Sequence, residues 1–245
     1  MLKNITLHIV DDYNALSKTA AQLFAEAVNA NPSGTYGFAT GGTPEGMYEE
    51  LCRMCQAKTV DLTQITAFNL DEYVPLSPDD PQSYYYYMAT KLFDVTGVKN
   101  RNIPNGDAPC PHQESAAYEK KIADSNGILL QILGIGTNGH IGFNEPADTF
   151  ARQTAYVALA EETINVNARF FDDIKDVPKF AISMGMQTIM MAETLLLLAS
   201  GASKAEILRE ALLGPITPNV PASVLQMHRN LIVIADKAAA KLLVE

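Results

Sequence analysis

The chain has 245 residues, of which 47% are hydrophobic, and its formal net charge at pH 7 is -10. This length and apolar content predict one sizeable α/β domain rather than two. The acidic balance argues against nucleic acid or an anionic membrane as the partner, because both require a basic surface. An anionic small molecule fits if a helix N-terminus and a few basic side chains bind it locally.

Strands and helices alternate along the chain. The predicted strands cover residues 5–10, 35–40, 65–70, 128–133, 154–159, 194–200 and 231–235. The predicted helices follow Asp11 or Asp12 to about residue 30, cover 44–58, 84–93, 112–126 and 161–171, and follow caps at Ser203 and Asp236. Residues 180–191 form a methionine-rich apolar segment that we assign to the core. Because most strands are apolar throughout, we predict a single-domain, doubly wound, Rossmann-like fold whose mostly parallel sheet has helices on both faces.

No stretch reaches the roughly 18 continuous apolar residues of a transmembrane helix, and the N-terminus runs directly into a strand pattern. Cys52, Cys55 and Cys110 are sparse and odd in number, which favours a reducing compartment over a disulfide framework. We therefore expect a soluble, cytoplasmic protein. Cys52 and Cys55 form a CxxC pair inside a predicted helix, but no second cluster supports a redox or zinc site.

A glycine turn follows the second predicted strand. Gly41, Gly42 and Thr43 precede Pro44, which we place at the first position of the next helix. Backbone N–H groups at the positive end of a helix can bind a phosphate oxygen, and glycine lets that oxygen approach closely. The alternative is an ordinary tight turn. No Walker lysine follows, so nucleoside triphosphate chemistry is not implied.

Two carboxylates follow the third predicted strand. Asp71 and Glu72 occupy the carboxyl end of that strand, where ligands bind in open parallel sheets. Neighbouring side chains of an extended chain point to opposite sides, so only one of the two can face a site, and we choose Asp71. The alternative is a solvated carboxylate at the start of a proline-rich loop.

Residues 128–146 read as a buried strand followed by a loop rich in glycine. His140 and Glu145 bring two proton-handling side chains to this loop, which indicates catalysis. Gly134, Gly136 and Gly139 also spell the GxGxxG fingerprint of dinucleotide-binding proteins. That alternative is disfavoured because too few residues remain for a crossover helix before the next strand.

Lys204 falls in the first turn of the helix that we place after Ser203. The helix dipole disfavours a cation there, and an anion bound between the lysine and the helix would explain it. Residues 161–171 form a mixed-polarity helix that carries Arg169. This helix is either a mobile cover, spanning about 159–182, or a surface helix.

Taken together, these motifs resemble the glucosamine/galactosamine-6-phosphate isomerase family, and within it the glucosamine-6-phosphate deaminases. The resemblance covers nearly the whole chain. The related 6-phosphogluconate lactonases share the fold but carry GxDGHTAS at the central loop, where this chain has NGHIGFNEP. The segments that carry the resemblance are residues 39–51, 68–84, 133–146, 167–171, 183–190, 203–206 and 221–228.

The resemblance implies an amino-sugar catabolic enzyme that converts glucosamine 6-phosphate and water to fructose 6-phosphate and ammonia without a metal or an organic cofactor. His140 is suited to opening the sugar ring, because imidazole titrates near neutrality. Glu145 would orient and charge-balance that imidazole. Asp71 is implied as the base that moves a proton from C2 to C1.

The same resemblance assigns the substrate phosphate to Gly41, Gly42 and Thr43, with positive charge from Arg169 and Lys204. Asn138 departs from family members that carry aspartate as a third member of the His140 and Glu145 group. An asparagine can still hold the histidine by a hydrogen bond.

Two alternative functions stay open at this point: a deaminase or isomerase for galactosamine 6-phosphate, and a sugar-phosphate sensor without turnover. Larger family members are hexamers whose activator phosphate is bound by basic residues. The matching positions here are Ala155 and Val157, which cannot bind phosphate. We therefore expect a monomer or a small homo-oligomer without this activation.

Overall fold

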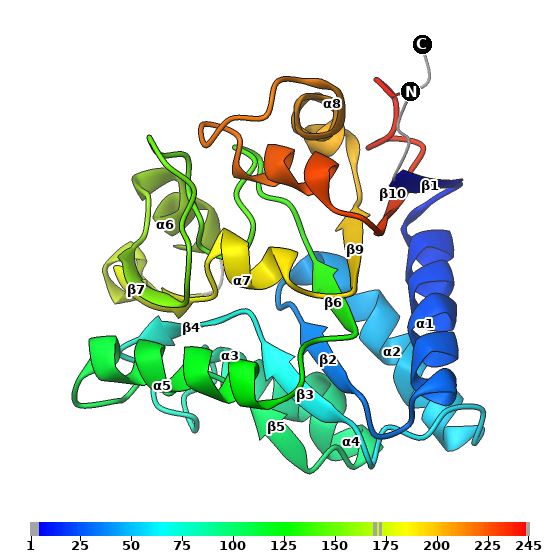
Figure 1. The fold of residues 1–245 in the computed structure, drawn as a ribbon, viewed down its shortest axis with the longest axis horizontal. Helices are drawn as coiled ribbons and strands as arrows, with labels where there is room; N and C mark the ends of the chain where they lie inside the picture. The colour runs from blue at the N-terminus through cyan, green and yellow to red at the C-terminus, as the bar shows by residue number, and fades with distance from the viewer. Residues whose placement is uncertain (1–4, 169–170, 172, 244–245) are drawn as a thin grey trace.

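The computed structural model describes residues 5–168, 171 and 173–243. Within these residues, seven parallel strands form a central sheet in the order β1-β10-β9-β6-β2-β3-β5 (Figure 1). The strands are β1 (Ile5–Val10), β2 (Thr35–Phe38), β3 (Thr66–Asn69), β5 (Asn100–Asn102), β6 (Leu130–Leu133), β9 (Thr194–Ala199) and β10 (Leu231–Asp236). The predicted parallel sheet is confirmed.

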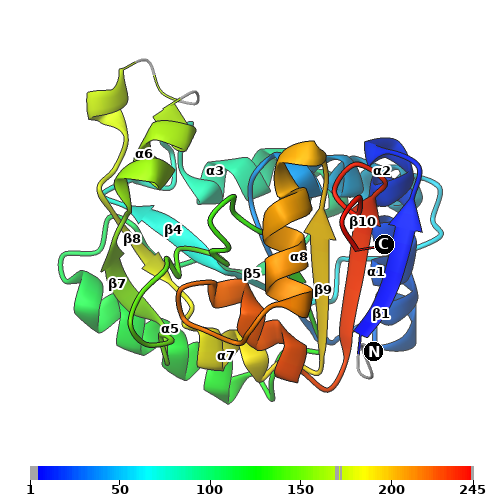
Figure 2. The same ribbon diagram turned by 90° about the horizontal axis from the view of Figure 1, so that it is seen from above.

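Helices cover both faces of this sheet, as predicted. Figure 2 shows α8 on one side of the sheet, with α1 and α2 on the other. The α-helices are α1 (Tyr13–Ala30), α2 (Gly42–Gln56), α3 (Tyr84–Met88), α4 (Asp94–Thr96), α5 (Pro111–Asp124), α6 (Glu161–Asn167), α7 (Met186–Met190) and α8 (Ala205–Leu213). The other helical segments are the π-helix η1 (Ala89–Phe93) and the 3₁₀ segments η3 (Ile174–Asp176), η4 (Ala202–Lys204) and η5 (Pro221–Met227).

The two faces of the sheet are packed by different aromatic groups. Phe38 of β2 projects toward Phe24 of α1 and Phe93 of η1, and both ring-centroid distances are 5.4 Å. On the opposite face, Phe68 of β3 meets Tyr118 of α5 at 5.8 Å. A strand buried on both faces requires apolar side chains at successive positions, as in β9, where Leu195, Leu196, Leu197 and Leu198 are all buried.

A second sheet was not predicted. In the part of the chain that the structure describes, β4 (Asp71–Val74), β8 (Phe180–Ser183) and β7 (Ala155–Ala158) form an antiparallel three-stranded sheet in the order β4-β8-β7. The alternative of a solvated carboxylate at the start of a loop was therefore wrong, because Asp71 begins a separate strand, and the methionine-rich segment also begins with a strand. Each of these strands is four residues long, and antiparallel pairing between distant segments leaves no local sequence signal.

Leu70 alone separates β3 of the central sheet from β4 of the second sheet. Its amide donates to the carbonyl of Phe38 at 3.0 Å, and its carbonyl accepts from the amide of Met184 at 2.8 Å. The backbone of Leu70 is thus bonded to both sheets. Asp71, the next residue, is held at their junction.

Three predicted helix ends differ in detail. Pro44 is the third residue of α2 rather than the first. Ser203 lies in η4, and Lys204 is the N-cap of α8. After β10 the described chain, up to residue 243, forms turns instead of a helix. The carboxylate of Asp236 accepts from Ser200 Oγ and the Gly201 amide as well as from Ala239, so it holds the turn after β9.

Candidate active site

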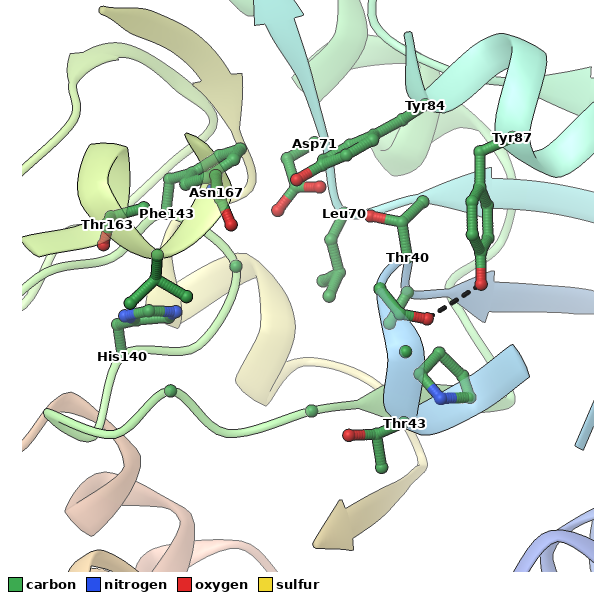
Figure 3. Close-up of a pocket in the computed structure, with 18 of the residues that line it drawn as sticks. Thr40, Thr43, Leu70, Asp71, Tyr84, Tyr87, His140, Phe143, Thr163 and Asn167 are labelled. Carbon is green, nitrogen blue, oxygen red and sulfur yellow. Dashed lines mark hydrogen bonds between the residues drawn. The ribbon is translucent and has the colours of Figure 1, made fainter. Parts of the chain in front are cut away.

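A cavity of about 310 Å³ opens at the carboxyl edge of the central sheet (Figure 3). The chain leaves β2 toward β3 in one direction and leaves β6 toward β9 in the other, so β2 and β6 flank a topological switch point. Crevices at such points are the usual ligand sites of open α/β sheets. Predicted site residues that line the cavity are Gly41, Gly42, Thr43, Asp71, Asn138, His140 and Lys204.

Asp71 is a buried carboxylate that faces the cavity. It is 5% exposed and begins β4, where it pairs with Ser183. A Cβ on Gly142 would lie 3.1 Å from Asp71 Oδ2, and the φ of Gly142 is +59°, so both the space and the backbone favour glycine there. Burial, and then the charge of Glu72, raise the pKa of Asp71 to about 8. Of the two neighbouring carboxylates, Asp71 lines the cavity and Glu72 does not.

Glu72 points the other way and stabilises the wall of the cavity. Its carboxylate accepts backbone N–H bonds from Tyr73 at 2.8 Å, Tyr84 at 2.9 Å and Tyr85 at 2.8 Å. Tyr84 and Tyr85 begin α3, so the carboxylate satisfies amides in the first turn of that helix. Burial raises the pKa of Glu72 to about 7 even though these three bonds favour its charged form. Glu72 therefore anchors α3 against β4 and is not available to a ligand.

We expect the raised pKa of Asp71 to be visible as a pH dependence of stability. Between pH 4 and pH 8 the native carboxyl keeps a proton that the unfolded chain releases, so the free energy of unfolding should fall as pH rises through this range. Denaturant titrations at both ends of the range, repeated on Asp71→Asn, measure the part of this slope that belongs to Asp71. An equal slope in wild type and variant would contradict the raised pKa.

His140 is held by a hydrogen-bonded group with Asn138 and Glu145. His140 Nδ1 lies 2.7 Å from Asn138 Oδ1, and Asn138 Nδ2 donates to Glu145 Oε2 at 2.8 Å. Since Glu145 takes the amide N–H, the amide oxygen must face the imidazole, which makes Nδ1 the donor and leaves Nε2 as the acceptor of a neutral ring. Asn138 thus keeps the hydrogen bond expected of it despite its departure from aspartate.

Glu145 lies behind the histidine rather than on the cavity wall. Its Oε2 is 3.4 Å from His140 Nδ1. Burial disfavours its charge, but the bonds from His140, and then from Thr163 and Asn138, outweigh burial and lower the pKa of Glu145. The carboxylate is therefore ionised at neutral pH, and it stabilises a positive charge that forms on the imidazole.

Residues 134–154 all lie within the described part of the chain, and they form a loop without a helix. A dinucleotide fingerprint must open a helix whose N-terminus binds the pyrophosphate, so that alternative is wrong for this turn. Gly136 has another purpose. A Cβ on Gly136 would lie 2.2 Å from His140 Cε1, and the imidazole therefore packs directly on the glycine backbone.

The opposite end of the cavity suits an anion. Gly42 and Thr43 begin α2, where the first amides have no partner within the helix. A Cβ built on Gly41 or Gly42 would meet no atom within 4 Å, so the space above both is open. Lys204 reaches the same cavity from the turn after β9.

Two tyrosines outside the predicted site hold this turn. Tyr87 donates to the carbonyl of Gly41 at 2.8 Å, the bond drawn dashed in Figure 3. Tyr13 donates to the carbonyl of Gly42 and accepts from the amide of Gly46, both at 2.8 Å. No sequence signal identified them, because the targets of their hydroxyls are set by how α1 and α3 pack against α2.

Helix α6 forms another wall of the cavity through Thr163, Val166 and Asn167. Asn167 Nδ2 donates to Tyr73 Oη at 2.8 Å, and Leu159 packs with Tyr73 in a small apolar cluster. The predicted helix at 161–171 is thus confirmed up to Asn167. Arg169, predicted to bind phosphate, lies outside the described residues.

The cysteine pair shows no sign of reactivity. Cys52 and Cys55 are free thiols on α2, and burial raises the pKa of both, that of Cys55 to about 11. A raised pKa suppresses the thiolate that redox and zinc chemistry require. Among residues 5–168, 171 and 173–243, no group of three or more His, Cys, Asp and Glu is arranged to hold a metal ion. In the same residues no helix is long and apolar enough to cross a membrane.

The fold and the cavity are those of an α/β enzyme in which a buried carboxylate and an imidazole line a single small-molecule site. The chain belongs to the family of glucosamine-6-phosphate isomerases and 6-phosphogluconolactonases, whose model matches residues 11–234. A glucosamine-6-phosphate deaminase of Clostridium perfringens is 48% identical over 97% of this chain and 99% of its own length. One from Alkaliphilus metalliredigens is 49% identical with the same coverage.

Solved structures agree with this assignment. A structure described as a monomeric glucosamine-6-phosphate deaminase has a TM-score of 0.94 and 43% identity, covering 97% of this chain and 99% of the other. A 6-phosphogluconolactonase from Trypanosoma cruzi has a TM-score of 0.76 at 18% identity, covering 98% and 97% of the two chains. The second likeness shows the shared fold alone.

Proposed function

We propose that the protein converts glucosamine 6-phosphate and water to fructose 6-phosphate and ammonia. One observation carries this proposal: a buried carboxylate, Asp71, and an oriented imidazole, His140, enter a single cavity whose far end is the N-terminus of α2. An aldose-to-ketose conversion needs both groups, because protons must move first between sugar oxygens and then between C1 and C2. Relatives named glucosamine-6-phosphate deaminase support the same chemistry.

His140 performs the ring opening in this proposal. Its Nε2 takes the proton from the O1 hydroxyl and returns it to O5, so the ring bond between C1 and O5 breaks and C1 becomes an aldehyde. Glu145 stabilises the imidazolium that exists between the two transfers. Asn138 keeps Nδ1 protonated throughout, which directs the exchange to Nε2.

Asp71 performs the isomerisation. Its carboxylate removes the proton from C2 of the open sugar while the aldehyde oxygen O1 takes up a proton released by the substrate ammonium, which gives a 2-amino enol. Asp71 then returns the C2 proton to C1. Water then adds to C2 of the resulting imine, and the carbinolamine expels ammonia to leave the C2 ketone of fructose 6-phosphate. Asp71 must be ionised to start this sequence, although burial raises its pKa. The ammonium group of the bound substrate favours the ionised carboxylate and so assists the base.

The substrate phosphate binds the amides of Gly42 and Thr43 and the ammonium of Lys204 in this proposal, with Arg169 as a further contributor. We expect Lys204→Ala to raise KM by roughly ten- to a hundredfold, the range for a hydrogen bond to a charged group, with a smaller change in kcat. Initial rates against substrate concentration measure both. Lys120→Ala, which removes a lysine exposed on α5, is the control, and an unchanged KM in Lys204→Ala would contradict this role.

The proposal treats residues 1–245 as a single domain. Within it, residues at about 159–182 act as a lid over the cavity. Support comes from α6, which lines the cavity while Thr163 is its sole buried residue. We expect amide hydrogen exchange in the described part, 159–168, to slow when a non-hydrolysed amino-sugar phosphate analogue binds. Exchange in α1, remote from the cavity, is the internal reference, and equal rates with and without the analogue would contradict the lid.

The decisive experiment measures ammonia and fructose 6-phosphate released from glucosamine 6-phosphate, with galactosamine 6-phosphate as the second substrate. Release from the gluco sugar supports the proposal. If ammonia is released from galactosamine 6-phosphate alone, that sugar is the substrate instead. If both sugars bind and neither releases ammonia, the protein is a sensor. The proposal also includes a cytoplasmic location, in line with relatives that are metabolic enzymes. It further includes a monomer or small homo-oligomer, which the monomeric relative supports and light scattering of the purified protein tests.

A further inference from the structure

Thr163 connects α6 to the group that holds His140. The threonine is 4% exposed, and its hydroxyl donates to Glu145 Oε1. The other oxygen, Oε2, accepts from Asn138 Nδ2 at 2.8 Å and lies 3.4 Å from His140 Nδ1. The carboxylate therefore faces the imidazole group with one oxygen and α6 with the other.

The orientation of this carboxylate matters for the whole group. The last torsion of a glutamate side chain has a broad, nearly two-fold energy profile, so packing and hydrogen bonds must fix the carboxylate plane. With Thr163 bonded to Oε1, the plane is set and Oε2 remains directed at Asn138. Asn138 in turn can present its carbonyl oxygen to His140 only while its amide N–H is taken by Glu145.

A neighbouring contact holds the same helix against the same loop. Thr137 Oγ1 donates to Glu162 Oε1 at 3.1 Å, and Thr137 directly precedes Asn138. Glu162 thus bonds to the side chain next to Asn138, and Thr163 bonds to the carboxylate of Glu145. The contacts are specific to this end of α6, because Asn167 at its other end binds Tyr73 instead.

We propose that Thr163 is a positioning residue: its hydroxyl fixes the Glu145 carboxylate, and through Asn138 it fixes the tautomer and orientation of His140. The kinetic part of this inference rests on the proposed function. Thr163 does not touch the reacting atoms in this assignment. It makes the acid-base competence of His140 depend on α6 being seated on the cavity.

Thr163→Val, which keeps the shape of the side chain and removes the hydroxyl, tests the inference, and Thr163→Ser restores the donor. Asn165→Val places the same valine on the exposed side of α6 and controls for helix stability. In substrate-free protein, the carbon-13 titration of Glu145 should move to higher pH in Thr163→Val, because a bond that favours the ionised form is lost. The nitrogen-15 spectrum of His140 should lose its bias toward the Nδ1–H form.

In the deaminase assay, Thr163→Val should lower kcat roughly tenfold with little change in KM, and Thr163→Ser should recover most of it. Thr163→Ala, which also lacks the hydroxyl but cannot crowd the site, must behave as Thr163→Val does. In a Glu145→Gln background the valine substitution should add little. Equal spectra and kcat in Thr163→Val and Asn165→Val would overturn the inference.

The spectroscopic arm needs no substrate and so separates this inference from the proposed function. If the wild type shows no turnover, the proposed function is wrong. The Glu145 and His140 spectra would still decide the role of Thr163. Normal turnover with unchanged spectra in Thr163→Val would defeat the inference alone.

Discussion

Asp71→Asn is expected to lower kcat by at least about a hundredfold, the usual scale for the loss of a general base. The amide has nearly the same size as the carboxylate, so the substrate should still bind and KM should change little. Ring opening by His140 should continue, because Asp71 has no part in that step. Steady-state rates of ammonia release, together with a direct binding titration, separate the loss of chemistry from a loss of affinity.

Deuterium exchange provides the sharper measurement for Asp71. In heavy water the wild type should incorporate deuterium during the transfer from C2 to C1, since the carboxylate exchanges its proton with solvent. Asp71→Asn should neither release ammonia nor exchange the C2 hydrogen. A variant with normal C2 exchange would remove Asp71 from the role of base, even if its kcat were low.

Gly136→Ala is expected to reduce kcat by roughly a hundredfold or more, the scale of a lost acid-base group, although Gly136 has no side chain to act in catalysis. The new methyl group would stand 2.2 Å from His140 Cε1 and 2.4 Å from both ring nitrogens. Contacts so short cannot exist, so the imidazole must leave its position. Its bond to Asn138 Oδ1 would then be lost or badly bent.

The double variant Gly136→Ala with His140→Gln is the control for this prediction. If the alanine acts only by displacing the imidazole, adding it to a chain that already lacks His140 should cost little further activity. Circular dichroism and thermal melting of each variant establish that the fold is retained. Full additivity of the two substitutions would show that Gly136 matters for another reason.

The sequence predicted the central sheet because its strands are short apolar runs separated by amphipathic helices, a pattern that requires burial on both faces. The alternation of side chains in an extended segment also predicted that only one of Asp71 and Glu72 faces a site, and Asp71 was the one chosen. The reason for that choice was incomplete. The residues form a strand of a second sheet, and Glu72 is occupied by the amides of α3.

Other parts of the site could not be predicted, because they depend on contacts between distant segments. Thr163 and Glu145 meet only once α6 folds over the central loop, and Tyr13 reaches Gly42 across two packed helices. A hydroxyl binds whichever acceptor the fold brings near, so its sequence neighbours carry no information about its partner. Asn138 was selected from a family motif, whereas its bond to Glu145 emerged from the structure.

The junction at Leu70 divides the enzyme into a fixed part and an adjustable part. Asp71 pairs with Ser183 in the second sheet and directly follows Leu70, whose backbone is bonded to both sheets, so in the proposed reaction the sugar must travel to Asp71. His140, by contrast, is carried by a glycine-rich loop whose shape depends on side-chain contacts. Substitutions in the loop and in α6 can therefore change how fast substrate enters and leaves the cavity. A shift in the strand of Asp71, by contrast, would have to be accommodated by both sheets at once.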